Sequence, residues 1–218
     1  MKILITGSSK GIGKSVSEYF LSKGYEVIGL DKLDSAISNP HYYHYNCDIS
    51  IDELPEINDL DYIFSNAGTQ NSGKDIDNNL IGAMRVIKKY SSLKSLKSIL
   101  FNASASARSG FEFDEYVASK AGLVGYMKHI ASTLSNRGIT VNSISLGGVM
   151  TESNNTVMND KDSWNKIMNV TPLKKWMKLE EVNEWVYFLL VINKSMSGQD
   201  LLIDNGEYNL NNTFVWPK

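Results

Sequence analysis

A tyrosine and a lysine four residues apart are the side chains of this sequence best suited to acid–base chemistry. Tyr116 and Lys120 fall within Asp114–Asn136, whose pattern predicts a long helix, so both side chains lie on one face, one turn apart. A phenol titrates near pH 10, and a nearby ammonium favours its ionised form and lowers its pKa. Ser104, which lies 12 residues before Tyr116, offers a hydroxyl that could hold a substrate oxygen beside the tyrosine. The set predicts proton exchange with a bound oxygen.

A glycine-rich run, TGSSKGIG over Thr6–Gly13, lies between the first predicted strand and the first predicted helix. Glycines there allow a tight turn, a close approach of backbone to a pyrophosphate, and close packing of the helix on the sheet. The helix N-terminus adds free N–H groups and a partial positive charge. The spacing is G-x-x-x-G-x-G rather than G-x-G-x-x-G, but its place in the chain predicts a dinucleotide site. A glycine-rich turn without a ligand is the alternative.

The type of dinucleotide depends on Asp31, which ends the second predicted strand 18 residues after Gly13. A carboxylate at this place accepts hydrogen bonds from the adenosine ribose and repels a 2′-phosphate, so it favours NAD. Lys10 and Lys32 act in the other direction, because either could pair with that phosphate. We expect NAD because the carboxylate should lie closest, with NADP possible.

The elements that position these residues alternate along the chain. Apolar runs predict strands at 2–6, 25–30, 42–46, 61–65, 98–102, 140–145 and 201–204, and amphipathic segments predict helices at 12–23, 76–90, 114–136 and 180–191. Such alternation requires right-handed crossovers and a parallel sheet with helices on both faces. We therefore expect residues 1–218 to form one doubly wound α/β domain.

Composition narrows the possible partners. Hydrophobic residues make up 42% and charged residues 21% of the chain, and the net charge is −2, which leaves no basic footprint for nucleic acid. No apolar run in the sequence is long enough to predict a membrane helix or a signal peptide. Cys47 is the single cysteine, so no internal disulfide can form. We expect an intracellular protein with no nucleic-acid or membrane partner.

Taken in order, these motifs resemble those of the short-chain dehydrogenase/reductase family over nearly the whole chain. The further matching positions are Cys47-Asp48, Asn66-Ala67-Gly68, Asn79, Val141-Asn142, Gly147 to Thr151, Gly198-Gln199 and Asp204-Asn205-Gly206. The resemblance implies a Rossmann fold and an oxidoreductase that transfers a hydride between a nicotinamide cofactor and a secondary alcohol or ketone.

The resemblance also implies roles for individual residues. Tyr116 would be the general acid/base, Ser104 would orient the carbonyl, Lys120 would lower the tyrosine pKa and bind the nicotinamide ribose, and Asn79 would hold a water in a proton relay. The cofactor would be bound by Gly7, Ser9, Lys10, Gly11, Ile12, Gly13, Asp31, Asp48, Ile49, Asn66, Ala67, Gly68, Tyr116, Lys120, Gly147, Val149 and Thr151. A cytoplasmic homodimer or homotetramer is implied, with the apolar Phe214–Trp216 segment docking on a neighbouring subunit.

Two other functions stay open at this stage. One is an NADPH-dependent reductase of acyl-thioester or pterin type, in which Lys10 and Lys32 override Asp31. The other is a non-catalytic protein that senses the dinucleotide.

Shortened connections at Lys32–His41 and Ile49–Leu60 predict that a peripheral helix is missing or reduced to a turn, and only 13 residues separate Asn66 from Asn79.

Two further segments need an interpretation. Residues 152–176 stand where the family has a substrate lid, and Trp164, Ile167, Met168 and Trp176 either line an apolar substrate pocket or pack on the sheet edge. His41, His44, Cys47 and Asp48 imitate a metal-ligand cluster. Because side chains alternate along a strand, His44 and Cys47 should point to opposite faces, and we expect no metal site.

Overall fold

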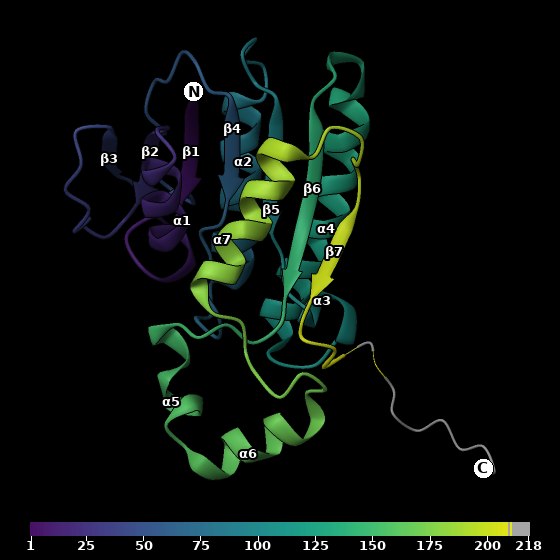
Figure 1. Ribbon diagram of the computed structural model, residues 1–218. Coiled ribbons are helices and arrows are strands. Elements are labelled where there is room, and N and C mark those ends of the chain that lie inside the picture. The colour runs from purple at the N-terminus through teal and green to yellow at the C-terminus, as the bar shows by residue number, and fades with distance from the viewer. Residues whose placement is uncertain (209, 211–218) are drawn as a thin grey trace.

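Short apolar runs form the strands of one parallel sheet in the computed structural model, which describes residues 1–208 and 210 (Figure 1). The predicted interface segment Phe214–Trp216 lies outside the described residues. The sheet has seven strands in the order β3-β2-β1-β4-β5-β6-β7, and every neighbouring pair is parallel. Their bounds are Lys2–Thr6 (β1), Glu26–Asp31 (β2), Tyr42–Asn46 (β3), Tyr62–Ser65 (β4), Ser98–Asn102 (β5), Thr140–Leu146 (β6) and Asp200–Ile203 (β7).

The strand order reverses between β1 and β4, which confirms the predicted doubly wound Rossmann fold. At such a reversal the loops that follow neighbouring strands diverge and leave a crevice at the carboxyl ends of the strands. The inner strands β4 and β5 are buried along their whole length, as apolar runs covered on both faces should be. The edge strand β3 alternates between half-buried and exposed residues instead.

Helices cover both faces of the sheet. The apolar faces of α1 (Gly11–Ser22) and α7 (Leu179–Tyr187) pack on one side, where the core contains Val16, Phe20 and Val186. The other side is covered by α2 (Gly82–Tyr90) and α4 (Asp114–Leu134). The predicted helix over 76–90 is present in two parts, because the π-helix η1 (Ile76–Ile81) leads into α2. Short helices also form at α3 (Ser106–Ser109), η2 (Ser135–Arg137) and η4 (Phe188–Ile192).

A polar segment that the sequence pattern left without secondary structure is helical. It forms η3 (Glu152–Asn154), α5 (Asn155–Met158) and α6 (Lys161–Val170), which lie beyond the carboxyl ends of the strands (Figure 1). Asp160 caps α6 by accepting a hydrogen bond from the backbone N–H of Asp162. The half-buried side chains of Trp164, Ile167 and Met168 share one face of α6. The rings of Trp164 and Trp176 meet edge to face, 5.2 Å apart.

The two shortened connections are irregular, as the sequence predicts. Residues 32–41 and 47–61 form turns and bends, and Leu54, Ile57 and Leu60 fill the space over the sheet. Side chains of α2 satisfy the carbonyl groups that a crossover helix would have paired internally. Arg85 donates to the carbonyls of Ile49 and Asp52 at 2.6 Å each, and Lys89 and Tyr90 donate to those of Leu54 and Pro55. Within the described residues, no helix is long and apolar enough to cross a membrane.

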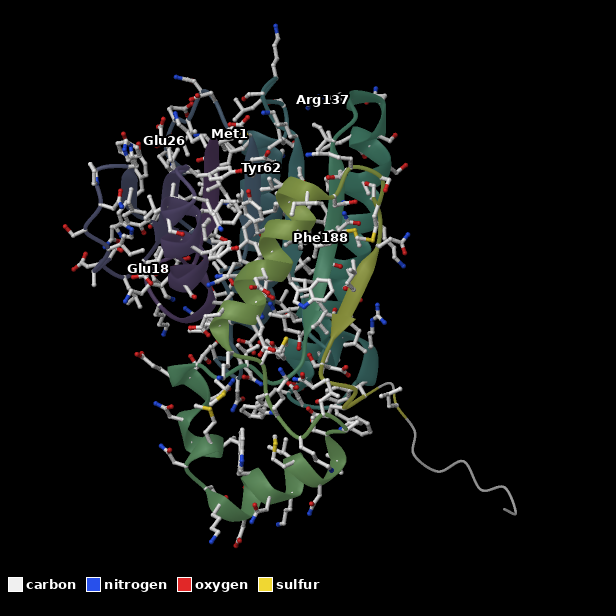
Figure 2. All side chains as sticks on the ribbon, in the orientation of Figure 1. Met1, Glu18, Glu26, Tyr62, Arg137 and Phe188 are labelled. Atoms are coloured by element: carbon white, nitrogen blue, oxygen red, sulfur yellow. The ribbon has the colours of Figure 1, made fainter. Side chains whose placement is uncertain are left out.

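The packing of α1 on the sheet predicts a large stability loss on truncation. Phe20 is fully buried and meets the rings of Tyr25 and Tyr187 at 5.1 and 5.6 Å. We expect Phe20→Ala to lower the free energy of unfolding by about 3–5 kcal/mol, measured by urea denaturation, because the cavity it leaves cannot collapse fully. Phe188, labelled in Figure 2, is 40% exposed and provides the matched control. Equal losses in the two variants would contradict the assignment of Phe20 to the core.

Candidate active site

The glycine run after β1 allows the backbone at the start of α1 to pack closely against the backbone of the preceding loop. Gly7 and Gly11 have φ angles of +69° and +52°, in the left-handed region that favours glycine. A Cβ on Gly13 would lie 1.9 Å from the Gly7 carbonyl oxygen, so α1 could not pack at its present place with any other residue there. The N-terminus of α1 is thereby held against the crevice. These residues fit the pyrophosphate of a dinucleotide, which needs a glycine cradle and free N–H groups.

A cleft of about 540 Å³ extends from this loop to the start of α4. It brings together most of the residues that the sequence assigns to the cofactor: Gly7, Lys10, Gly11, Ile12, Asp31, Asp48, Ile49, Asn66, Ala67, Gly68, Tyr116, Lys120 and Thr151. The segments that supply them are far apart in the chain and follow different strands. A cleft of this size and position suits an extended ligand at the carboxyl edge of the sheet.

The other predicted residues lie behind the cleft wall. The backbone N–H of Ser9 donates to Asp31 Oδ2 at 2.9 Å. Gly147 allows the chain after β6 to approach Asp204, whose Cα would lie 2.8 Å from a Cβ at this position. Val149 is buried and pairs with Met177 in an isolated parallel bridge. These residues support the shape of the cleft and do not line it. Ser104, Asn79 and the glycine at position 13 also lie outside the lining.

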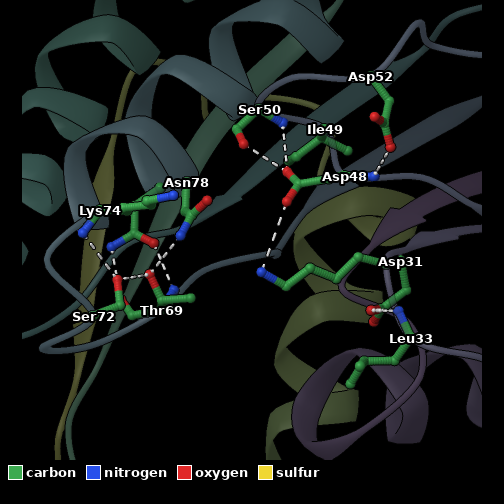
Figure 3. A network of polar contacts seen from close by, with 12 residues as sticks. Asp31, Leu33, Asp48, Ile49, Ser50, Asp52, Thr69, Ser72, Lys74 and Asn78 are labelled. Atoms are coloured by element: carbon green, nitrogen blue, oxygen red, sulfur yellow. Dashed lines mark hydrogen bonds and ion pairs between the residues drawn. The ribbon is translucent and has the colours of Figure 1, made fainter.

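Carboxylates and a lysine occupy one end of the cleft (Figure 3). Both oxygens of Asp31 accept backbone hydrogen bonds of 2.9 Å, from Ser9 and from Leu33. The Lys32 ammonium lies 3.7 Å from Asp48 Oδ2, while Ser50 donates to Asp48 Oδ1. Burial disfavours the charge of Asp48, but the Ser50 hydrogen bonds and Lys32 outweigh it and hold the pKa of this carboxyl below its usual range.

Two asparagines connect the ends of three neighbouring strands. Asn66, after β4, donates to the carbonyls of Thr6 and Gly7 at 3.0 and 3.3 Å. Asn102, the last residue of β5, donates to Asn66 Oδ1 at 2.9 Å. The buried Oδ1 atom of Asn102 has no hydrogen-bond partner in the described part of the chain, and Asn102 lines the cleft. Sequence reasoning missed Asn102, although a polar residue at the carboxyl end of a predicted strand was a signal for it.

Lys120 is buried at the opposite end of the cleft, at 4% exposure. Its ammonium donates a 2.7 Å hydrogen bond to the carbonyl oxygen of Asn102 and lies 5.7 Å from the centre of the Tyr116 ring. Burial lowers the pKa of Lys120 to about 8, and the charge of Asp75 acts in the opposite direction. The lysine thus holds its proton weakly for a lysine but still carries it at neutral pH.

The predicted effect of Lys120 on the pKa of Tyr116 stays a prediction, and the tyrosine pKa in this structure is set mainly by burial. Burial raises the pKa of Tyr116 to about 12; Ser104 acts against this rise, and the charges of Glu112 and Asp75 add to it. The Lys120 ammonium is directed to the Asn102 carbonyl. Ser104 is itself buried, and its oxygen accepts a 2.8 Å hydrogen bond from the Ser106 hydroxyl.

Asn79 lies in the π-helix η1, a kind of local distortion that is frequent at functional sites. Its side chain makes two hydrogen bonds with the loop before η1. Oδ1 accepts from the Thr69 N–H at 2.7 Å, and Nδ2 donates to the Thr69 carbonyl at 2.9 Å. Nδ2 also donates to Ser119 Oγ at 2.9 Å, next to Lys120 in the chain. The amide therefore connects this loop to α4, and its predicted work on a water stays a prediction.

The histidines and the cysteine that imitate a metal cluster have other contacts. His44 Nδ1 lies 3.3 Å from the Tyr42 hydroxyl, and the buried Cys47 thiol donates to the Glu53 carbonyl. In the part of the chain that the structure describes, no three His, Cys, Asp or Glu side chains group as metal ligands would.

The contact between Gly13 and Gly7 predicts the effect of one methyl group. In Gly13→Ala, either α1 moves away from the sheet or the loop changes shape, so we expect NADH to bind more than about tenfold more weakly, a loss of about 1.4 kcal/mol. The measurement is fluorescence energy transfer from tryptophan to NADH. Gly125→Ala on α4 is the control, because nothing lies within 4 Å of its Cβ. Unchanged NADH affinity in Gly13→Ala would contradict the assignment of the glycine loop as the pyrophosphate site.

Known proteins are similar to this chain in sequence and in fold. The model of the enoyl-(acyl carrier protein) reductase family matches residues 55–207. The 3-oxoacyl-(acyl-carrier-protein) reductase FabG of Buchnera aphidicola is 27% identical, over 94% of this chain and 96% of its own. The L-xylulose reductase of Caenorhabditis elegans is also 27% identical, over 94% of each chain. A solved 4-hydroxyisoleucine dehydrogenase mutant, complexed with NADH and succinate, has a TM-score of 0.86 at 25% identity and covers 97% of this chain and 100% of its own.

The family match extends over well more than half of the chain and includes Asn66, Asn102 and the Tyr116–Lys120 pair of α4. The relatives match almost from end to end, so the fold and the activity class apply to the whole chain. That class is the nicotinamide-dependent oxidoreductases acting on CH–OH or C=O groups. The chain belongs to the short-chain dehydrogenase/reductase family.

Proposed function

We propose that this oxidoreductase uses NAD(H) to interconvert a secondary alcohol and a ketone, with Tyr116 as its general acid/base. One observation carries the proposal: a single cleft has the Asp31 carboxylate near one end and Tyr116 with Lys120 at the other. An extended dinucleotide bound with its pyrophosphate at the N-terminus of α1 would place its adenosine at the first end and its reactive ring at the second.

The preference for NAD(H) is supported by the charges around Asp31. This carboxylate is held by two backbone N–H groups at the place that a 2′-phosphate would need. Lys32, one of the two lysines that could recognise such a phosphate, lies against Asp48. Lys10 is exposed and lines the cleft, so it is the residue on which the alternative preference depends.

The side chains at the far end are suited to move a proton. When bound, the cofactor supplies or accepts the hydride at the substrate carbon. With its pKa near 12, Tyr116 is a neutral phenol at physiological pH and can donate its proton to the substrate oxygen during reduction. The Lys120 ammonium stabilises the phenolate that this donation leaves. Ser104, held by Ser106, orients the oxygen. Oxidation reverses these steps and is favoured as the pH rises.

The helices beyond the strand ends support a covering role. We propose that residues 152–176 form a lid over the substrate, because Thr151, Ser153 and Asn154 line the cleft and α5 and α6 follow them beyond the carboxyl ends of the strands (Figure 1). Trp176 is buried against Gly148, where a Cβ would lie 2.0 Å from the indole nitrogen, so this ring anchors the lid to the body. A cytoplasmic location and a homodimer or homotetramer stay predictions from the family resemblance.

A second candidate is reduction of an acyl thioester with NADPH. Two similarities favour it: the matching family model is described as an enoyl-(acyl carrier protein) reductase, and FabG acts on 3-oxoacyl groups attached to acyl carrier protein. The same tyrosine and serine would serve this reaction, so the cofactor and the substrate separate the two candidates.

The charge of Asp31 predicts the cofactor preference. We expect NADH to bind at least about tenfold more tightly than NADPH in parallel fluorescence titrations, because the carboxylate repels the 2′-phosphate. Asp31→Asn should reduce this ratio, whereas Asp34→Asn, which removes a nearby exposed charge, should leave it unchanged. Tighter binding of NADPH would favour the second candidate and place Lys10 in control of the preference.

The placement of Tyr116 predicts a selective loss of turnover. Tyr116→Phe should reduce turnover of a ketone panel by about 10²–10⁴-fold, measured as NADH consumption, since the proton donor is gone. The affinity for NADH should stay within twofold of wild type, about the scatter of such titrations. Tyr126→Phe, on the same helix, is the control. Retained turnover in Tyr116→Phe would exclude Tyr116 as the acid/base, and absence of turnover in wild type with every ketone and thioester would favour the sensing function.

A further inference from the structure

The loop between β4 and η1 is organised around one buried carboxylate. Asp75 is only 1% exposed, and no role has been assigned to it so far. Its Oδ1 accepts from the Thr69 hydroxyl at 2.7 Å and from the Ser72 hydroxyl and N–H at 2.5 and 3.2 Å; its Oδ2 accepts from the Asn71 N–H at 2.7 Å. Thr69 and Ser72 are labelled in Figure 3. Every partner donates, so an ionised carboxylate satisfies the loop better than an amide could.

Through Thr69 this carboxylate reaches the catalytic end of the cleft. The Asn79 side chain accepts a hydrogen bond from the Thr69 N–H and donates one to the Thr69 carbonyl. Asn79 also donates to the Ser119 hydroxyl, which in turn donates to the Tyr116 carbonyl. The contact is tight: a Cβ on Gly68 would lie 2.9 Å from Asn79 Oδ1 and 3.5 Å from Lys120 Nζ. A change in the loop is therefore transmitted to Asn79 and to the lysine.

We propose that Asp75 is a positioning residue of the reaction: it holds Thr69, and through it Asn79, and its buried negative charge balances the Lys120 ammonium. This inference rests on the proposed function, because the roles of Lys120 and Asn79 are assigned there. The loop between β4 and η1, residues 67–74, has no helix or strand of its own and is held instead by the hydrogen bonds to the Asp75 carboxylate.

The charges around the lysine agree with this role. Burial opposes ionisation of Asp75, but hydrogen bonds from Ser72 and Thr69 outweigh it and hold its pKa below the usual range. Burial lowers the pKa of Lys120, and Asp75 is the charge that acts against this. Other charged or titratable groups near this end are Tyr116 and Glu112, together with Glu115, whose carboxylate accepts from the Asp75 N–H at 3.3 Å. Tyr208 and Glu207 also lie close enough to Tyr116 and Glu112 to interact with their charges. Without Asp75, the lysine would lose its proton at a lower pH.

The test measures the titration of Lys120 directly in the protein without cofactor. Lysine labelled with ¹³C at Cε is followed by NMR across pH 6–11, a range chosen to span both the buried and the usual pKa, and Lys120→Met assigns the signal. We expect the pKa of Lys120 to fall by about one unit in Asp75→Asn. Asp77→Asn is the matched control, because it removes the same charge from an exposed position in η1. An unchanged Lys120 titration in folded Asp75→Asn, or an equal shift in Asp77→Asn, would overturn the proposal.

A reciprocal measurement keeps the proposal testable if Asp75→Asn does not fold. The same coupling requires that loss of the ammonium in Lys120→Met raise the pKa of Asp75, observed as the ¹³Cγ shift of labelled aspartate. No change would overturn the charge coupling. Because neither titration uses a cofactor or a substrate, both outcomes are separate from the proposed function, which fails instead if NADH does not bind or Tyr116→Phe keeps its turnover.

Discussion

Every neighbouring pair of strands in the sheet runs in the same direction, and this constraint places the ends of β1, β2, β4, β5 and β6 along one edge. Each parallel connection must cross the sheet and return, so the residues that follow the strands gather where the chain leaves the sheet. Asp31, Asn66 and Asn102 come together for this reason although they are far apart in sequence. The position of the cleft thus follows from the strand directions, and the side chains at the strand ends determine what it can bind.

Direct links also join the ends of neighbouring strands. Asn66 and Asn102 provide such links through side-chain hydrogen bonds to Thr6, Gly7 and each other. The Asn102 carbonyl also accepts a hydrogen bond from the Lys120 ammonium. The network that links the strand ends therefore also holds the lysine of α4. A buried ammonium without this acceptor would carry a large desolvation cost.

The catalytic end illustrates how burial and charge compete. Burial alone raises the pKa of Tyr116 and lowers that of Lys120, which moves both groups toward their neutral forms. A phenol that keeps its proton is a suitable donor for ketone reduction, while the lysine still has to remain cationic to stabilise the phenolate. The shortened loop, with Asp75 at its centre, lies where a charge can support that lysine.

Much of this protein could be predicted from sequence because local signals were strong. The strands and the long helices follow from apolar periodicity, the glycine cradle from TGSSKGIG, and the Tyr116–Lys120 pair from helical spacing. These features depend on neighbours within a few residues. The helices of the 152–170 segment were not predicted, since polar, Asn-rich residues give little periodic signal and are ordered by their contacts.

The tertiary structure alone decided the electrostatics of the site. Spacing placed Lys120 beside Tyr116, but the direction of the tyrosine pKa depends on burial. The acceptor of the Lys120 ammonium, the Asn102 carbonyl, comes from strand β5. Likewise, the pairing of Lys32 with Asp48 joins residues from separate segments. Residue types and local patterns establish which groups are present and which elements carry them. Their charge states depend on distances and burial across the fold, which no local pattern contains.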